Sequence, residues 1–242
     1  MAVGRPTYLF IVCSAHPRVG KTLTARLVVE FQQANDRPVA AFDLGTGASA
    51  LAEFLPDVTT PAAIDEINGQ MALFERLASD DGAPKVVDVG HRALAPLFMI
   101  MREVDFATIA AQRAIQPIVL YVAAPTELSA RGYAILRDQF PAFGFVPVEN
   151  AYATQGYSIE EAFPTSLVGA PSLQLPELSP ALQVFVERRP CSFAEIHRSG
   201  QHELPPELWT EFDNWLRQCF RQLRDLDLAL QMNDPGSSSG ES

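Results

Sequence analysis

The segment YLFIVCSAHPRVGKTLTARLVVEF, residues 8–31, decides the fold class of this chain. It begins with an apolar run at 8–13, which is long enough for a buried strand. A short loop then leads to the triplet Gly-Lys-Thr at 20–22. Apolar residues recur on one face of a helix over 22–33. The segment therefore predicts a strand, a loop and a helix, the first unit of an α/β fold.

The rest of the chain repeats this alternation of buried strands and helices. Further strands are expected at five apolar runs, 39–42, 86–89, 117–125, 143–150 and 172–178. Helical spacing of apolar residues is found between them, over 62–78, 93–113 and 127–140. This pattern favours a single α/β domain with a mostly parallel, twisted sheet and helices on both faces. The domain is expected to cover 1–232.

The C-terminal part of the chain is expected to form one long helix over 207–231. Its apolar stripe, which includes Trp209 and Trp215, favours packing on the domain, with a dimer contact as the second interpretation. The tail 233–242 is short and polar and is expected to be disordered.

The composition argues against nucleic acid and membranes as partners. The chain has 18 basic and 29 acidic residues and a net charge of −11. Non-specific DNA binding needs clustered Lys and Arg, so DNA is not an expected partner. No apolar run approaches the ~20 residues that cross a membrane, and the N-terminus lacks a signal-peptide pattern. We therefore expect a cytoplasmic protein. The three cysteines and four histidines have no metal-ligand spacing.

Residues 15–22 occupy the place of the phosphate-binding pattern GxxxxGK(S/T), and they match its last three positions. In such loops backbone N–H groups hold the phosphates, the Lys reaches the β- and γ-phosphates, and the Ser/Thr hydroxyl holds Mg²⁺. The N-terminus of the following helix adds to the attraction of the anion. Asp43 and Asp88 end two later strands. Together these residues predict ATP and Mg²⁺ as cofactors.

The loop SAHPRVGKTLTARL, 14–27, resembles the deviant Walker A loop KGGVGKT of the ParA/MinD/MipZ group of P-loop ATPases. AFDLGTG at 41–47 is similar to the first switch of that group, and VVDVGH at 86–91 to its Walker B-like strand. FVPVEN at 145–150 resembles its base-contacting strand. The resemblance covers roughly residues 7–195, and the phosphate loop is its one specific motif.

The resemblance implies a role for each matching residue. Lys21 would contact the phosphates, and Thr22 and Asp88 would hold magnesium, Asp88 through water. Asp43 would lie at the switch, and Asn150 near the base. The remaining residues that would line the nucleotide are Ala15, His16, Pro17, Arg18, Val19, Gly20 and Leu23.

The chain departs from the group's pattern at three places. The signature lysine, which is given across a dimer to the partner's nucleotide, falls at His16, and the next two glycines fall at Pro17 and Arg18. The second acid of the switch, which positions the attacking water, falls at Gly45. Pro17 has no N–H to donate. The Arg18 guanidinium suits phosphate oxygens and is a candidate to replace the lysine; the alternative is that it points into solvent.

These residues indicate retained nucleotide binding and weakened hydrolysis. Catalytic roles are expected of Lys21, Asp43 and Arg18. The resemblance implies a nucleotide-dependent switch with weak ATPase activity, in which ATP controls a homodimer or contact with an unidentified protein partner. Two alternatives stay open. One is an interaction module that keeps the fold without nucleotide. The other is an ATP-dependent metabolic enzyme of the dethiobiotin-synthetase or cobyrinate-amidase type, although the Thr-Asp-Thr-Gly part of that loop is missing.

Overall fold

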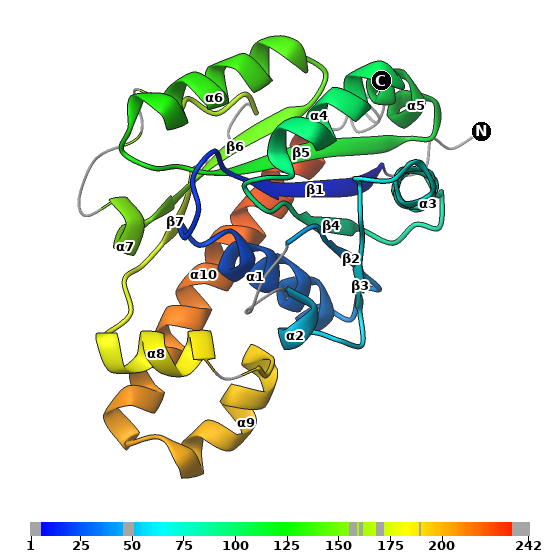
Figure 1. The fold of residues 1–242 in the computed structure, drawn as a ribbon. Coiled ribbons are helices and arrows are strands. Elements are labelled where there is room, and N and C mark those ends of the chain that lie inside the picture. The colour runs from blue at the N-terminus through cyan, green and yellow to red at the C-terminus, as the bar shows by residue number, and fades with distance from the viewer. Residues whose placement is uncertain are drawn as a thin grey trace, which may run out of the picture.

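The chain folds around one sheet, as a computed structural model shows (Figure 1). The structure describes residues 6–45, 51–154, 159, 162–167, 172–188 and 190–233. Within them the sheet has seven strands, all parallel, in the order β3-β2-β4-β1-β5-β6-β7. The strands are β1 (Thr7–Cys13), β2 (Ala40–Asp43), β3 (Thr59–Pro61), β4 (Lys85–Asp88), β5 (Ile115–Val122), β6 (Gly144–Asn150) and β7 (Leu173–Leu175).

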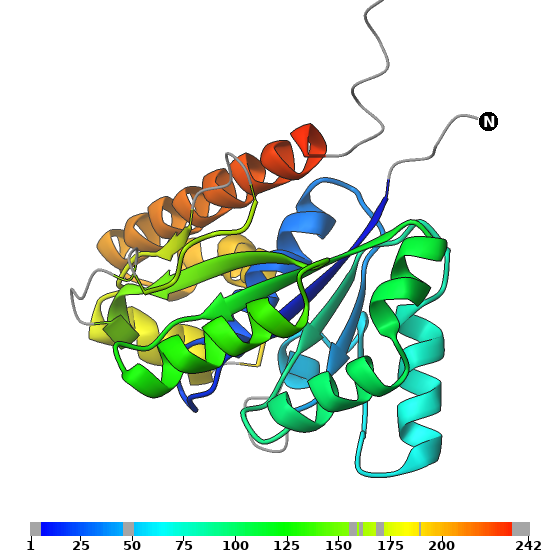
Figure 2. The same cartoon turned by 90° about the horizontal axis from the view of Figure 1, so that it is seen from above.

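Helices cover both faces of the sheet (Figures 1 and 2). One layer packs in the cluster that includes Phe10 and Val12 of β1, and it contains α1 (Lys21–Ala34), α2 (Leu51–Phe54), α8 (Pro180–Arg188), α9 (Phe193–Glu203) and α10 (Pro206–Met232). The other packs in the cluster that includes Leu9 and Ile11, and it contains α3 (Ile67–Leu77), α4 (Leu94–Glu103), α5 (Phe106–Gln112) and α6 (Glu127–Gln139). Alternate residues of a buried strand thus face opposite layers.

The expected fold class is confirmed, with a sheet that is parallel throughout its described strands. The short helix α7 (Ala151–Thr154) follows β6 directly. The C-terminal helix runs from Pro206 to Met232, and its Phe212 and Trp215 are buried in the core, as the favoured interpretation expected. Residues 234–242 of the expected tail lie outside the described residues, and the domain limits stay a prediction. In the described part of the chain no helix is both long and apolar enough to cross a membrane.

One sequence expectation about the helices was wrong in detail. The helix expected over 62–78 begins at Ile67, because the edge strand β3 and the segment after it occupy the positions before it. The helices expected over 93–113 are present as α4 and α5, and Asp105, with φ 48°, interrupts helical geometry between them.

The helix after the phosphate loop is fastened to the α8–α9 region by two buried charges of α1. Arg26 donates to the carbonyls of Val186 and Cys191 at 3.0 and 3.1 Å. Its guanidinium lies between the rings of Phe54 and Phe193, 3.9 and 4.1 Å from their centroids. Glu30, one turn later, accepts hydrogen bonds from the first N–H groups of α9. Sequence periodicity did not predict α8 or α9.

Candidate functional site

The carboxyl ends of three adjacent strands meet at the start of α1. Val12 of β1 pairs in register with Asp88 of β4, and Asp88 pairs with Asp43 of β2. The loop that leaves β1 therefore lies beside both carboxylates. In open parallel sheets ligands bind at this edge, where the chain leaves the carboxyl ends of the strands.

The loop turns sharply before α1 through two residues with positive φ. Arg18 has φ 59° and Gly20, the N-cap of α1, has φ 101°. A Cβ atom at position 20 would overlap the side-chain amide of Asn150, so glycine is needed both for the backbone angle and for the close approach. No side chain caps the N-terminus of α1. Its first N–H groups therefore point at the loop without helical partners, as an anion site requires.

Lys21 lies inside the loop. Its Nζ donates to the His16 carbonyl at 2.6 Å, and the residue is buried. Burial lowers the pKa of Lys21, and the Asp88 carboxylate opposes that change. The ammonium is thus held at the N-terminus of α1, where it adds a positive charge to the helix dipole.

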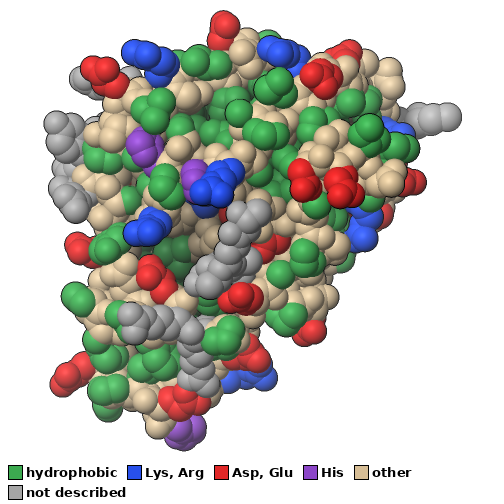
Figure 3. All heavy atoms as spheres, viewed as in Figure 1, with side chains coloured by type: hydrophobic (Ala, Val, Ile, Leu, Met, Phe, Trp, Pro, Cys, Tyr) green, Lys and Arg blue, Asp and Glu red, His purple; other side chains and the backbone are tan. Residues whose placement is uncertain are grey.

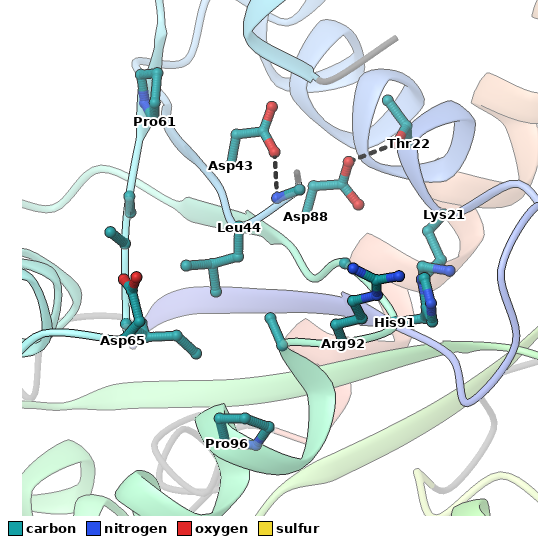
Figure 4. A pocket seen from close by; sticks show the side chains of 16 residues that line it. Lys21, Thr22, Asp43, Leu44, Pro61, Asp65, Asp88, His91, Arg92 and Pro96 are labelled. Carbon is teal, nitrogen blue, oxygen red and sulfur yellow. Dashed lines mark hydrogen bonds between the residues drawn. The ribbon is translucent and has the colours of Figure 1, made fainter. Parts of the chain in front are cut away.

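Thr22 and Asp88 lie beside Lys21 and are joined by a hydrogen bond. The Thr22 hydroxyl donates to Asp88 Oδ2 at 2.6 Å (Figure 4). Burial raises the pKa of Asp88 to about 7, and the nearby Asp43 charge adds to the rise, while the Thr22 hydrogen bond and Lys21 oppose it. A hydroxyl and a carboxylate are the oxygen ligands that Mg²⁺ takes, and a divalent cation would stabilise the ionised form of Asp88.

The Asp43 carboxylate accepts hydrogen bonds from backbone N–H groups nearby. Its Oδ1 accepts a hydrogen bond from Gly45 N at 2.7 Å, and its Oδ2 accepts one from Ala52 N at 3.0 Å. The carboxylate therefore fixes the start of the switch-like segment, of which 46–50 lie outside the described residues. A Cβ atom at Gly45 would lie 2.9 Å from Asp43 Oδ1.

A cleft of about 700 Å³ opens on the Lys21 side of the loop (Figure 4). Lys21, Thr22, Asp43 and Asp88 line one end of it. Gly45, where the resemblance expects the second acid of the switch, also lines the cleft. The other lining residues were not expected at the site from the sequence: Leu44, Pro61, Ala62, Ala63, Ile64, Asp65, Gly90, His91, Arg92, Ala93 and Pro96. On the face of the molecule shown in Figure 3, basic and histidine side chains gather near the middle.

A far smaller hollow, of about 60 Å³, lies on the other side of the loop. Arg18, Gly20, Asn150 and Tyr152 line it together with residues from the α8 side. Asn150, expected near the base, is buried, and its Nδ2 donates to the Val19 carbonyl at 3.0 Å. Pockets for small ligands usually measure about 300–1,000 Å³, so this side is closed as it stands.

The first half of the loop is held within its own chain. The His16 ring lies 2.7 Å from the Thr126 hydroxyl, which also caps α6 by accepting from Ser129 N. Ala15 N donates to the Tyr121 hydroxyl at 3.4 Å. Pro17 and Arg18 are exposed. Arg18 makes no hydrogen bond or ion pair with another residue in the part of the chain that the structure describes.

The structure thus divides the residues expected at the site. Lys21, Thr22, Asp43 and Asp88 meet at one cleft, whereas Arg18 and Asn150 line the hollow on the opposite side. Val19 is buried in the core, and Leu23 packs partly against it. His91 and Arg92 carried a signal in the sequence, because they lie three and four residues after Asp88, in the loop that leaves this strand.

The chain shares its fold with MinD, a cell division protein. It matches a chain of the MinC:MinD cell division protein complex of Aquifex aeolicus with a TM-score of 0.50 and 16% identity, covering 90% of this chain and 95% of that one. A structure of MinD from Aquifex aeolicus matches with a TM-score of 0.48 and 17% identity over 90% of this chain and 97% of that one. No protein-family model and no curated protein matches the sequence. At this identity the likeness is one of fold, that of a P-loop NTPase.

Proposed function

We propose that this chain is an ATP-binding switch, in which Mg-ATP binds at the loop 15–22 and changes self-association or contact with a protein partner. The observation that carries the proposal is the pairing of Thr22 with Asp88 beside Lys21, at the uncapped N-terminus of α1. A lysine, a hydroxyl and a carboxylate at such a helix end supply the groups that a phosphate chain and its Mg²⁺ need.

The residues present fit the phosphate and metal end of a nucleotide. The N–H groups of the first turn of α1 and the Lys21 ammonium would hold the phosphates. Thr22 would bind Mg²⁺ directly and Asp88 through water, once the metal replaces the Thr22–Asp88 hydrogen bond. When bound there, the metal would supply positive charge that offsets the charge of the phosphates.

The base end requires a rearrangement. In this proposal the base lies by Asn150 and Tyr152, at the hollow of about 60 Å³. The Asn150 amide would then exchange its hydrogen bond to Val19 for one to the base. Tyr152 is 52% exposed, so its ring could stack on a base without any loss of core packing.

Slow hydrolysis is part of the proposal. Gly45 stands where the resemblance expects the water-positioning acid, and both carboxylate oxygens of Asp43 accept backbone hydrogen bonds. Phosphoryl transfer is accelerated mainly by positioning and charge stabilisation. Without a carboxylate to orient the water, turnover should stay below the usual enzyme range of ~1–1,000 per second.

Protein rather than DNA is the partner class that the surface supports. The chain carries a net charge of −11, which opposes non-specific binding to DNA. Ile67 and Met71, one turn apart on α3, are 73% and 65% exposed. Exposed apolar side chains that adjoin one another favour contact with another protein surface. The matched Aquifex aeolicus structure is itself a complex of MinD with MinC.

Sedimentation with each nucleotide tests the switch. The chain should form a larger species with Mg²⁺ and a non-hydrolysable ATP analogue than with Mg-ADP or without nucleotide. Lys21→Ala should sediment alike in all three conditions. The same mass for the wild-type chain in all three, at concentrations where the analogue is bound, would remove self-association from the proposal and leave a partner protein as its target.

A second candidate function is supported by the far wall of the cleft. Beyond the charged end, the lining consists mainly of the apolar residues Leu44, Pro61, Ala62, Ala63, Ile64 and Pro96. A small carboxylate substrate with an apolar body would fit there, as in an ATP-dependent metabolic enzyme. ATP hydrolysis that rises strongly with an added aliphatic dicarboxylate or amino acid would favour this function over the switch.

A further inference from the structure

Arg92 places a positively charged side chain at the cleft. It lies between Asp88, the last residue of β4, and the start of α4, and it is exposed. It lines the same cleft as Lys21, and Figure 4 shows its side chain directed toward the end where Lys21 and Asp88 lie. Among the described residues it has no hydrogen-bond or ion-pair partner.

None of the carboxylates that line the cleft forms an ion pair with Arg92 among the described residues. Asp43 is held by two backbone N–H groups, and Asp88 accepts the hydroxyl of Thr22. Asp65 lines the cleft from the segment between β3 and α3, and no ion pair joins it to Arg92. His91 and Lys21 are the other titratable groups of the lining. Lys21 and Arg92 line one cleft, and among the described residues no ion pair joins either of them to a carboxylate of the lining, so an anion that entered there would meet two cations.

The two residues that the sequence offered in place of the signature lysine do not face this space. His16 is within hydrogen-bonding distance of Thr126. Arg18 lines the hollow on the opposite side of the loop, with Asn150 and Gly20. Of the arginines and histidines considered, only His91 and Arg92 line the cleft that begins at Lys21.

We infer that Arg92 binds the terminal phosphate of the triphosphate within its own chain, and that it distinguishes ATP from ADP. The inference rests on the proposed function. The loop and α1 hold the phosphates nearer the nucleoside, whereas the cleft lies beyond Lys21 and Thr22, where the γ-phosphate would project. The planar guanidinium of an arginine can donate hydrogen bonds to two phosphate oxygens at once, whereas the ammonium of a lysine acts as a point charge. ADP has no group that reaches this position.

Calorimetric titration of the full chain with Mg²⁺ and either a non-hydrolysable ATP analogue or ADP tests the inference. Arg92→Ala should weaken the analogue about tenfold to a hundredfold, the usual range for hydrogen bonds to a charged group, and ADP less than about threefold. Arg92→Lys should fall between Arg92→Ala and wild type. Arg102→Ala is the matched control, because it removes the same charge from an exposed arginine in the last turn of α4, outside both the cleft and the hollow, and it should change both affinities less than about threefold. Arg18→Ala is measured beside it, because Arg18 is the residue that the sequence offered in place of the signature lysine.

An equal loss for both nucleotides in Arg92→Ala, or no loss for either, would overturn the role of Arg92. So would a larger selective loss in Arg18→Ala. If the wild-type chain binds neither nucleotide, the proposed function fails together with the inference. If it binds both and only the selectivity of Arg92→Ala is missing, the inference alone fails.

Discussion

The two sides of the loop 15–22 differ more than the sequence suggests. On one side a cleft of about 700 Å³ brings together Lys21, Thr22 and Asp88 with an arginine from the next loop. On the other side Asn150 donates to the loop backbone, and a hollow of about 60 Å³ remains. In the proposed function, the first side would receive the phosphates and the metal without rearrangement, whereas the second would have to open to admit a base.

This difference has a physical origin in the sheet. The sheet order places β4 beside β1 and β2 beyond β4, so that two strand-end carboxylates in register lie on the cleft side of the loop. On the β6 side, the strand ends in the neutral amide of Asn150, which donates to the Val19 carbonyl. A buried neutral amide is easily satisfied by a carbonyl, whereas two buried carboxylates repel each other and favour a cation between them.

Among the tests that compare the two sides, the metal should have the largest effect on nucleotide binding. Asp88→Asn should remove the Mg²⁺ dependence of ATP binding, because the amide has no negative charge for the cation. Wild-type affinity should fall at least about tenfold when EDTA replaces Mg²⁺, which is more than 1.4 kcal/mol, and the mutant should show little difference. Titrations with and without Mg²⁺ on both proteins measure this. Equal metal dependence in the mutant would break the assignment of the cleft side as the metal side.

A side chain at position 45 should harm the cleft side rather than restore hydrolysis. The new Cβ of Gly45→Asp would lie 2.9 Å from Asp43 Oδ1, and its charge would face a second carboxylate. We expect a loss of about 1–3 kcal/mol in the free energy of unfolding, as for other overpacked sites, and no gain in ATP turnover. Chemical denaturation and a phosphate-release assay decide this. A faster ATPase with unchanged stability would show that the switch segment accepts the family's acid.

The charge of Asp88 should also cost stability in the absence of metal. Its pKa is raised from 3.8 to about 7 in the folded chain, so the folded state keeps a proton that the unfolded state releases between these values. Stability contributed by the protonated form is therefore lost as the pH rises toward 7. In EDTA, Asp88→Asn should be more stable than wild type by about 1–2 kcal/mol at pH 8, a gap smaller at pH 5.5. Melting curves of both proteins at both pH values measure this difference. The same difference in stability at pH 5.5 and pH 8 would contradict the prediction.

The smallest effect expected is the contribution of the base. If the cleft side supplies most of the binding free energy, Mg-tripolyphosphate should bind within about tenfold of Mg-ATP, a difference of up to 1.4 kcal/mol. Competition of tripolyphosphate against a fluorescent ATP analogue measures the ratio. A loss of a thousandfold would show that the narrow hollow opens at little cost and that the two sides contribute comparably.

The parts of the molecule that were predictable from sequence are those encoded by local pattern. The apolar run before the loop, the Gly20-Lys21-Thr22 triplet and the periodic helix after it are contiguous, and β1 and α1 formed as expected. The acids at the ends of β2 and β4 were also placed correctly, because parallel strands bring their carboxyl ends to one edge.

The features that could not be predicted from the sequence depend on contacts between segments that are distant in the chain. His16 meets Thr126 across 110 positions, and no local pattern announces this contact. α8 and α9 are held by Arg26 and Glu30, more than 150 positions earlier in the chain. Ile67 and Met71 share the helical spacing of the apolar residues over 62–78 and yet lie exposed, so spacing alone does not tell which of these residues are buried. Arg92 entered the site only because β4 lies between β1 and β2.

The central claim is that the loop 15–22 binds Mg-ATP through Lys21, and one measurement tests it most directly. Mg-ATP is titrated into wild type, Lys21→Ala and Arg18→Ala, with the melting temperature of each recorded. The account predicts at least a hundredfold weaker binding in Lys21→Ala, about 2.7 kcal/mol, with little change in melting and near wild-type affinity in Arg18→Ala. Equal affinity in wild type and Lys21→Ala would contradict it.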